Sequence, residues 1–293
     1  MKPATNWIAI APVIFVVLWA TGFVVARLSA DHVEPFTFLA IRFPIVCAIF
    51  VVIAGLQKAA RPSPVQAFHG AVAGALLYGG YLGPIYWAVA HGMPAGVSAL
   101  IVGLQPLITG ILAAAIVGEK ITGRHWFGLA AGIFGVGLVV WPKLAFEAVS
   151  GITPLTTMLC ILGAFSTSLG TVYQKRFATG LHLASGGVWQ NAGAAVVVLA
   201  GAMTLENFGF DGSPQAWVAL GWSVVVLSLA ASTLFMLLIR HGDVSKVSGL
   251  IYLVPAVAAV MAYLVFGETL VPIQILGMAV CAGAVFIVTR KAV

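Results

Sequence analysis

Two long stretches of this sequence, residues 91–138 and residues 241–286, repeat one another, with matching residues 149 or 150 positions apart. The clearest matches are His91-Gly92 with His241-Gly242, Val97-Ser98 with Val247-Ser248, Pro106 with Pro255, and Gly118-Glu119 with Gly267-Glu268. Such a duplication restricts the chain to folds that are built from two equivalent units. We therefore predict two homologous halves, residues 1–146 and residues 147–293.

The composition places both halves in a lipid bilayer. Hydrophobic residues make up 61% of the chain and charged residues only 8%, and the mean hydropathy is +1.10. An apolar run of about 18 residues or more is long enough to cross the hydrocarbon core as a helix. Ten such runs are present, at residues 7–29, 33–55, 67–90, 94–117, 123–142, 150–174, 182–204, 214–239, 244–267 and 271–290. The sequence thus predicts an all-α membrane protein with ten transmembrane helices.

The basic residues predict how these helices are oriented, because Lys and Arg in short loops stay on the cytoplasmic side of a membrane. With ten spans, the N-terminus, every second loop and the C-terminus together hold eleven of the fourteen Lys and Arg residues. Both termini are therefore expected in the cytoplasm. The net charge of +6 then reflects membrane topology and is no sign of nucleic-acid binding.

Each predicted half has five spans, which is an odd number, so the second half enters the membrane from the side opposite to the first. The halves are then inverted repeats, related by a pseudo-twofold axis in the membrane plane. Many secondary transporters have this design, and they open a central site to alternate sides of the membrane. The predicted fold is two inverted five-helix repeats around a central cavity, and the predicted activity is transport.

Several short motifs are shared with a known family. They are Leu18-Trp19-Ala20-Thr21-Gly22-Phe23, Arg42-Phe43, Gly118-Glu119 and Gly267-Glu268. Together they resemble the drug/metabolite transporter superfamily in its EamA-type ten-helix branch. The resemblance implies a multi-pass protein of the bacterial inner membrane that exports small metabolites. Amino acids are among the family's substrates, and aromatic amino acids are those of the YddG-type exporters.

Pro106 and Pro255 fall near the middle of the fourth and ninth predicted spans. A proline inside a helix removes a backbone donor and frees the carbonyl of the residue four positions earlier. In transporters, corresponding interruptions in the two halves point to the binding site. We therefore expect helix breaks beside a solute site at both prolines. Ordinary kinks, whose freed backbone groups are satisfied by neighbouring helices, are the alternative.

Aromatic and polar side chains near mid-membrane are the candidates for contacting the solute. Tyr and Trp combine a broad apolar face with one polar group, which suits a cavity for a molecule with an apolar or aromatic portion. The substrate-binding candidates are Trp19, Tyr78, Tyr81, Gln105, Ser166, Ser168 and Tyr252. Core packing of the aromatic rings and hydrogen bonding between helices by the amide and hydroxyl groups are the alternatives.

Arg42 is the only formal charge well inside a predicted span. An unpaired charge there would cost about 2.5–3.5 kcal/mol even on a lenient insertion scale, so it must pair, snorkel or face water. We favour a structural role, in which the side chain reaches toward Asp31 and Glu34, and attraction of a substrate carboxylate is the alternative. Glu119 and Glu268 recur at equivalent turns, where we expect them to cap the helices that follow.

The sequence offers no catalytic group, cofactor site or metal site. It lacks the Gly-x-x-x-x-Gly-Lys-Ser/Thr motif of ATP-driven motors, and its three cysteines fall singly in different spans, as packing residues do. We predict a secondary exporter of small metabolites, above all amino acids with an aromatic preference. Nucleosides and cationic drugs are alternative solutes, whereas a membrane enzyme and a scaffold or receptor are alternative functions. The protein is expected to be a monomer or a homodimer.

Overall fold

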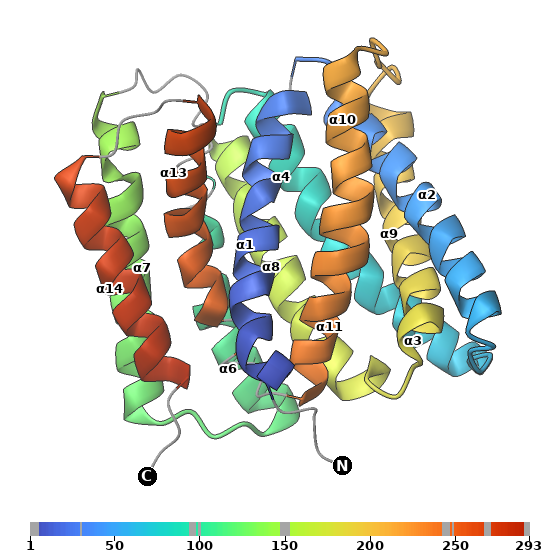
Figure 1. Ribbon diagram of the computed structural model, residues 1–293, viewed down its shortest axis with the longest axis horizontal. Coiled ribbons are helices and arrows are strands. Elements are labelled where there is room, and N and C mark those ends of the chain that lie inside the picture. Colours follow the sequence, from blue (N-terminus) through green and yellow to red (C-terminus); the bar gives the residue numbers. More distant parts are fainter. Residues whose placement is uncertain are drawn as a thin grey trace.

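The chain folds into a single bundle of long helices (Figure 1). The computed structural model describes residues 6–29, 31–93, 98, 101–146, 153–241, 247, 249–266 and 271–289. Within these ranges all the named elements are helices, and the β-type pairing consists of one isolated antiparallel bridge between Val33 and Phe210. The predicted all-α class is therefore confirmed for the described part of the chain.

The helices follow one another in two similar series. The first comprises α1 (Asn6–Ser29), α2 (Pro35–Leu56), α3 (Pro64–Gly74), η1 (Ala75–Gly79), α4 (Gly80–Ala90), α6 (Gln105–Val117) and α7 (Gly123–Phe146). The second comprises α8 (Pro154–Tyr173), η2 (Gln174–Ala178), α9 (Leu183–Leu205), α10 (Pro214–Trp222), η3 (Ser223–Ala231), α11 (Ser232–His241), η4 (Leu250–Tyr252), α13 (Leu253–Phe266) and α14 (Pro272–Thr289). The segments η1, η2 and η3 are π-helical and continue the α-helices beside them, whereas η4 is a 3₁₀-helix.

Several of these helices are suited to a bilayer. Five are long and apolar enough to cross it, namely Pro35–Leu56, Pro64–Ala90, Pro154–Ala178, Leu183–Leu205 and Pro214–His241, and shorter apolar helices occupy Ile10–Ala26, Gln105–Val117 and Pro272–Ile287. Large apolar side chains cover the outside, such as Leu56, Val196 and Leu264, which are 80%, 70% and 72% exposed. Lipid solvates such a surface, whereas water does not. The total of ten spans stays a prediction.

Two helices begin in the same way, 150 residues apart. Ser63 precedes Pro64 and its side chain accepts a hydrogen bond from the backbone N–H of Gln66 at 3.2 Å. Ser213 precedes Pro214 in the second half, and its side chain accepts from a backbone N–H at 3.3 Å. The serine satisfies a donor that the first helical turn leaves open, and proline at the first position has no donor to satisfy.

The same two helices also match in their middles and at their ends. Each contains a π-helical segment, η1 in the first and η3 in the second, and the bounds of η1 shifted by 150 residues fall inside η3. At the ends, Nδ1 of His91 lies 2.8 Å from the carbonyl oxygen of Trp87, and Nδ1 of His241 lies 2.9 Å from that of Leu237. The repeated sequence thus produces a repeated local structure.

Helices of the two halves pack against each other along the whole bundle (Figure 1). α7 packs along α14 at one side of the molecule, and α2 packs along α9 at the other. Between them, α4 packs against α8 and α1 packs against α13. Each of these pairs joins the first half to the second, so the halves form one interlocked body.

Glycines allow the closest approaches of α7 to its neighbours. A Cβ atom at Gly132 would lie 2.4 Å from Cδ2 of Tyr252, and one at Gly135 would lie 2.8 Å from Sγ of Cys281. Both distances are shorter than van der Waals contact, so a larger residue would push the helices apart. These two glycines therefore serve packing within the chain.

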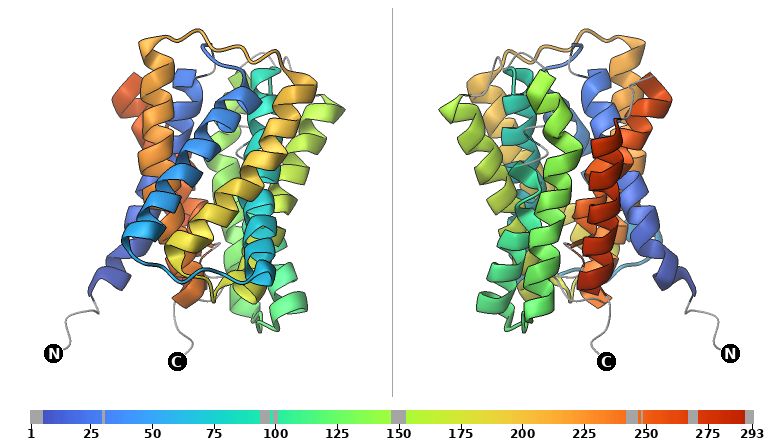
Figure 2. Two further views of the ribbon diagram at one scale, coloured as in Figure 1. Left: turned by 90° about the vertical axis from the view of Figure 1, so that its right-hand side faces the viewer. Right: turned by 90° about the vertical axis from the view of Figure 1, so that its left-hand side faces the viewer.

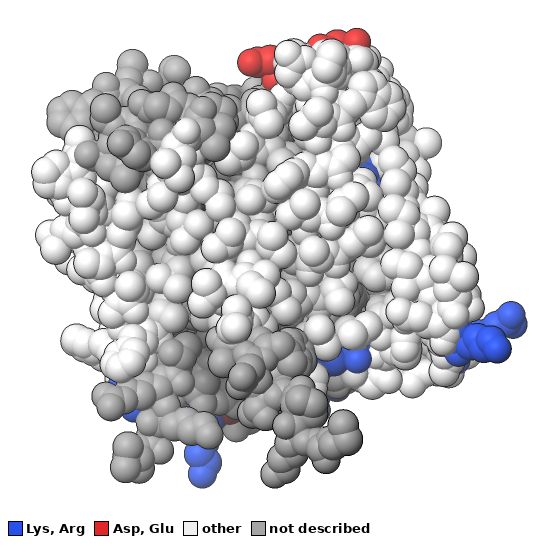
Figure 3. Space-filling model, in the orientation of Figure 1, with Lys and Arg blue, Asp and Glu red and all other residues white. Residues whose placement is uncertain are grey.

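Charged side chains gather at the two ends of the bundle (Figure 3). α1 begins and α14 ends at one end (Figure 2). Most of the Lys and Arg side chains visible in Figure 3 lie at that end, and most of the visible carboxylates lie at the other. At the carboxylate end, Nδ1 of His32 lies 2.6 Å from Oδ2 of Asp211. The backbone N–H of Ser213 and then the His32 ring lower the pKa of the Asp211 carboxyl. The gathering of Lys and Arg at the end where α1 begins agrees with the pattern that the sequence predicts.

Candidate functional site

The helix that carries Pro106 is interrupted just before this residue. Residues 103–104 form a turn, in which the N–H of Leu104 donates to the carbonyl of Ile101 at 3.0 Å, and α6 then begins at Gln105. Pro106 lies in the first turn of α6, where the backbone N–H groups have no partner inside the helix and proline is well accepted. The backbone changes from a tight turn to an α-helix at this point.

The helix that carries Pro255 is interrupted at the corresponding place. The 3₁₀ segment η4 leads directly into α13, which begins at Leu253, and Pro255 lies in the first turn of α13. The side chain of Pro255 lies outside the described residues. Both halves therefore contain a non-α segment that ends two or three residues before the repeated proline.

Gln105 and Ser168 meet at the first of these interruptions. Oγ of Ser168 in α8 lies 3.2 Å from the backbone carbonyl oxygen of Gln105 and 2.7 Å from the backbone carbonyl oxygen of Ala164, so it can donate to either. Ser168 is fully buried and Gln105 is 2% exposed. The serine thus links α8 to the start of α6 and holds the interruption in place.

Tyr252 holds the second interruption. Its hydroxyl donates to the carbonyl oxygen of Leu129 in α7 at 3.1 Å, and its ring packs on Gly132. The residue has no exposed surface. In this conformation Tyr252 therefore contacts protein on all sides and offers no face to a solute.

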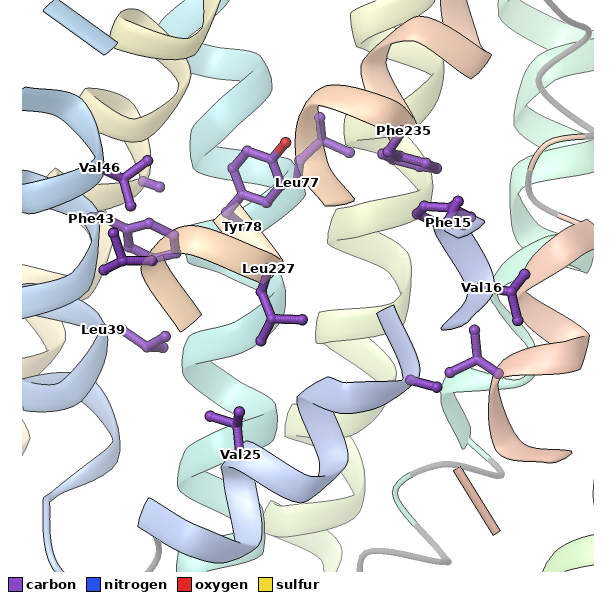
Figure 4. Packing of buried hydrophobic residues seen from close by; sticks show 14 of the residues in the cluster. Phe15, Val16, Val25, Leu39, Phe43, Val46, Leu77, Tyr78, Leu227 and Phe235 are labelled. Atoms are coloured by element: carbon purple, nitrogen blue, oxygen red, sulfur yellow. The ribbon is translucent and has the colours of Figure 1, made fainter. Parts of the chain in front are cut away.

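Tyr78 lies in the π-helical segment η1 and is only 4% exposed. Its ring centroid is 6.2 Å from that of Phe43 in α2, and its hydroxyl points away from Phe43 (Figure 4). The hydroxyl lies beside the Ser232 side chain, and Arg42 acts on it electrostatically, but no described group lies within hydrogen-bonding distance of it. Because a buried hydroxyl without a partner is costly, this group is available to a polar ligand.

Two further buried hydroxyls share this property with Tyr78. They belong to Thr109 and Ser223, and neither has a hydrogen-bond partner among the described residues. Thr109 lies in α6, just after the interruption before Pro106, and Ser223 begins the π-helical segment η3. The unsatisfied hydroxyls therefore occur in or beside the irregular helices, whereas most buried polar groups in proteins are paired.

Arg42 lies in α2 with a side chain that is 4% exposed. Its Nε donates to Oγ of Ser228 in η3 at 2.8 Å, and its guanidinium carbon lies 5.5 Å from the centroid of the Phe43 ring. The pairing with Asp31 or Glu34 that the sequence suggests is not formed. The Glu34 carboxylate instead accepts from the backbone N–H groups of Asn207 and Gly209, at 3.0 and 2.6 Å.

Trp19 and Tyr81 are both partly exposed. The Trp19 ring in α1 lies 5.2 Å from that of Phe15 and 5.6 Å from that of Phe235 in α11. Tyr81 lies in α4, beyond the π-helical segment that contains Tyr78. Their accessible faces are what a solute-contacting ring requires.

Ser166, the remaining hydroxyl candidate, links two helices. Its Oγ in α8 donates to the carbonyl oxygen of Leu76 in η1 at 2.9 Å. A π-helical segment shifts the backbone hydrogen-bond pattern by one residue; here the N–H of Gly80 reaches the carbonyl of Ala75. The serine supplies a donor to the neighbouring carbonyl and thereby fixes η1 against α8.

Of the two repeated glutamates, Glu119 and Glu268, the structure describes Glu119. Gly118 ends α6 with φ of 75°, a left-handed conformation that glycine adopts readily, and the N–H of Glu119 donates to the carbonyl of Ala113 at 3.2 Å. The backbone of Glu119 therefore closes α6, and capping of α7 by its side chain stays a prediction. Glu268 lies outside the described residues.

The sequence did not indicate which residues surround Arg42. Ser228 is 186 residues away in the sequence, and Tyr86 of α4 joins Tyr78 near the guanidinium. These neighbours come from helices whose packing no local motif indicates. Tyr78 and Arg42 are brought together, as are Gln105 and Ser168, whereas Tyr252 packs separately against α7.

Both halves of the sequence match one protein family. The EamA-like transporter family matches residues 6–141 and again residues 155–290. This chain belongs to the EamA-like transporter family. The EamA-type prediction is confirmed, and membership indicates a transporter rather than an enzyme.

This EamA-family chain is also similar to individual proteins over most of its length. It is 24% identical over 273 residues to the uncharacterized inner membrane transporter YedA of Escherichia coli strain K12, covering 93% of this chain and 87% of that protein. It is 27% identical over 289 residues to the probable amino-acid metabolite efflux pump of Salmonella typhimurium, covering 93% and 91%. A solved crystal structure shares the fold with a TM-score of 0.79 at 20% identity, covering 96% and 95%. Together with its apolar helices, these likenesses indicate a multi-pass inner-membrane protein.

Proposed function

We propose that this EamA-family protein is a secondary transporter that exports small metabolites by alternating access, with amino acids, and aromatic ones foremost, as its solutes. The observation that carries the proposal is the pair of interrupted helices at Pro106 and Pro255. Interrupted helices in corresponding positions of two repeats typically form the binding site of secondary transporters. Here the repeated family match supplies the two repeats, and the repeated prolines supply the interruptions.

The proposed topology is ten spans in two inverted five-helix repeats, with both termini in the cytoplasm. The two ends of the described chain lie at the same end of the bundle (Figure 2), which requires an even number of crossings. The basic end is assigned to the cytoplasm because Lys and Arg are retained there. The carboxylate end then faces the periplasm.

The solute contacts are assigned to the aromatic candidates. Trp19 and Tyr81 have accessible faces, and Tyr78 has a hydroxyl without a described partner. A supporting role is assigned to the candidates whose contacts fix an interrupted or π-helical element. These are Ser166, Ser168 and Tyr252, through their hydroxyls, and Gln105, through its backbone carbonyl. The name of the Salmonella relative, a probable amino-acid metabolite efflux pump, supports amino acids as the solute class.

A counterflow assay tests the function itself. Purified full-length protein is reconstituted in proteoliposomes that are loaded with unlabelled solute, and uptake of the labelled solute is measured for amino acids, nucleosides and cationic drugs. We expect counterflow of phenylalanine and tryptophan above that of the other classes. Counterflow confined to nucleosides or drugs would contradict the solute assignment, and no counterflow of any solute would contradict transport.

Variants of the aromatic candidates test the site. Tyr78→Ala and Trp19→Ala are expected to reduce phenylalanine counterflow by about tenfold, because each removes a ring that contributes roughly 1.5–3 kcal/mol of apolar contact. Trp126→Ala is the matched control, because Trp126 lies in α7 with a ring that is 44% exposed. Unchanged counterflow in both site variants, at equal amounts of inserted protein, would show that these rings only pack.

A further inference from the structure

We propose that the Arg42 guanidinium binds the carboxylate of the transported solute, so that the solutes of this protein are carboxylate-bearing molecules. This inference rests on the proposed function and deepens it, because it names the chemical group that the site selects. It also assigns Arg42 the solute-binding role that the sequence left as the alternative.

Arg42 has no counter-charge among the described residues. Arg42 is 4% exposed, and a buried cation is stable only when an anion or several hydrogen bonds compensate its lost hydration. No described carboxylate forms an ion pair with it. Glu206 instead accepts from the backbone of α2, Glu34 accepts from the chain after α9, and Asp211 pairs with His32.

The geometry of the guanidinium suits a carboxylate. Its Nε donates to Ser228 at 2.8 Å, which fixes the plane of the group between α2 and η3. The two terminal nitrogens donate to no described residue. A pair of guanidinium nitrogens matches the two oxygens of a carboxylate, and this planar fork is why Arg is favoured over Lys for carboxylate recognition.

Uncharged groups surround the guanidinium. Arg42 acts electrostatically on the Tyr78 hydroxyl, which lies beside the Ser232 side chain with no described group within hydrogen-bonding distance. It can donate to an anion held by Arg42, which would satisfy a buried group that is otherwise unpaired. The other near neighbours, Tyr86, Ser228 and the Phe43 ring, are uncharged. The surroundings therefore supply donors and an aromatic face but no negative charge.

The groups near Arg42 come from irregular segments of the fold. Tyr78 lies in η1 and Ser228 lies in η3, the π-helical segments of two corresponding helices. Segments of this kind occur frequently at functional sites. Arg42 thus contacts η3 directly through Ser228 and interacts electrostatically with Tyr78 of η1, so an anion bound there would be near the irregular segments of both halves.

Matched solutes test the inference on the unaltered protein. Binding is measured as the increase in thermal stability of the purified full-length protein, and competition as the inhibition of labelled phenylalanine counterflow. Phenylalanine and 3-phenylpropionate carry the carboxylate, whereas phenylalaninamide and phenethylamine lack it. We expect the carboxylates to act at concentrations about 10- to 100-fold lower, the range that a charge-assisted hydrogen-bonded contact contributes. Equal potency of phenylalanine and phenylalaninamide would overturn the proposal.

Variants then locate the selecting group. Arg42→Gln is expected to remove the advantage of the carboxylates while leaving phenylalaninamide within about twofold, and Arg42→Lys to retain part of it. Arg61→Gln, which removes an exposed charge in the loop before α3, is the control and should retain the full advantage. A parallel loss for acid and amide would assign Arg42 a purely structural role. If Arg42→Gln does not fold, Arg42→Lys and the matched solutes on the unaltered protein decide the matter.

The two proposals fail in different ways. Counterflow that does not distinguish acid from amide would reject carboxylate recognition and leave the transport function standing. Carboxylate-selective, Arg42-dependent stabilisation without counterflow of any solute would reject transport and leave the binding site standing.

Discussion

The hydroxyl of Tyr252 donates a hydrogen bond to the carbonyl oxygen of Leu129 at 3.1 Å and so joins the interrupted helix of the second half to α7 of the first. The ring itself has no exposed surface and lies against Gly132. Because Tyr252 ends η4 immediately before α13, this contact fixes where the 3₁₀ segment gives way to the α-helix that carries Pro255.

Tyr252→Phe should lower the free energy of unfolding by about 0.5–1.5 kcal/mol, the net contribution of one hydrogen bond. The ring remains and keeps its packing, so solute selectivity in counterflow should not change. Thermal unfolding of the purified protein in detergent measures the stability. Tyr252→Ala, which also removes the ring, should cost about 3–5 kcal/mol, and equal stability of the Phe and Ala variants would contradict the packing described above.

Gly132→Ala should destabilise the protein by about 1–3 kcal/mol, because its Cβ would overlap the Tyr252 ring at 2.4 Å. Gly137→Ala is the matched control in the same helix, because a Cβ there meets nothing within 4 Å. The control should be neutral or more stable by up to about 1 kcal/mol, since alanine favours the helix over glycine. Equal effects of the two substitutions on thermal unfolding would show that α7 does not pack closely on η4.

Helix positions could be predicted because the apolar runs are bounded by turn residues. The expected spans at 33–55 and 182–204 correspond to α2 at Pro35–Leu56 and α9 at Leu183–Leu205. The expected span at 214–239 likewise begins where α10 does, at Pro214. These features are local, since a hydroxyl cap and a proline act within one helical turn.

The surroundings of Arg42 could not be predicted in the same way. The sequence suggested Asp31 and Glu34 because they are near in the chain, whereas the partner that forms is Ser228 in the other half. The sequence also does not indicate that Tyr78 lies in a π-helical segment. Both differences arise from packing between distant helices, which local periodicity does not record.

Glu206→Ala should lower the free energy of unfolding by about 0.5–2 kcal/mol, the range for loss of a helix cap. The Glu206 carboxylate accepts from the backbone N–H groups of Phe36 and Thr37 at 2.8 and 2.7 Å, so it caps α2 from the end of α9. Asp31→Ala removes an exposed carboxylate in the same region and should change stability by less than about 0.5 kcal/mol. Thermal unfolding of both variants checks this, and equal stabilities would contradict the capping role.

The proposed topology predicts which residues are reached from outside the cell. Cys160 and Cys281 are fully buried and Cys47 is half-buried, so a background in which all three are replaced by Ala or Ser is suited to single-cysteine labelling. In intact cells, a membrane-impermeant maleimide should label Asp31→Cys at the carboxylate end, and it should label Arg61→Cys only after permeabilisation, because Lys and Arg mark the cytoplasmic side. The reverse pattern would invert the orientation and leave the fold intact. Labelling of both cysteines from one side would contradict a bundle whose acidic and basic ends lie across the membrane from each other.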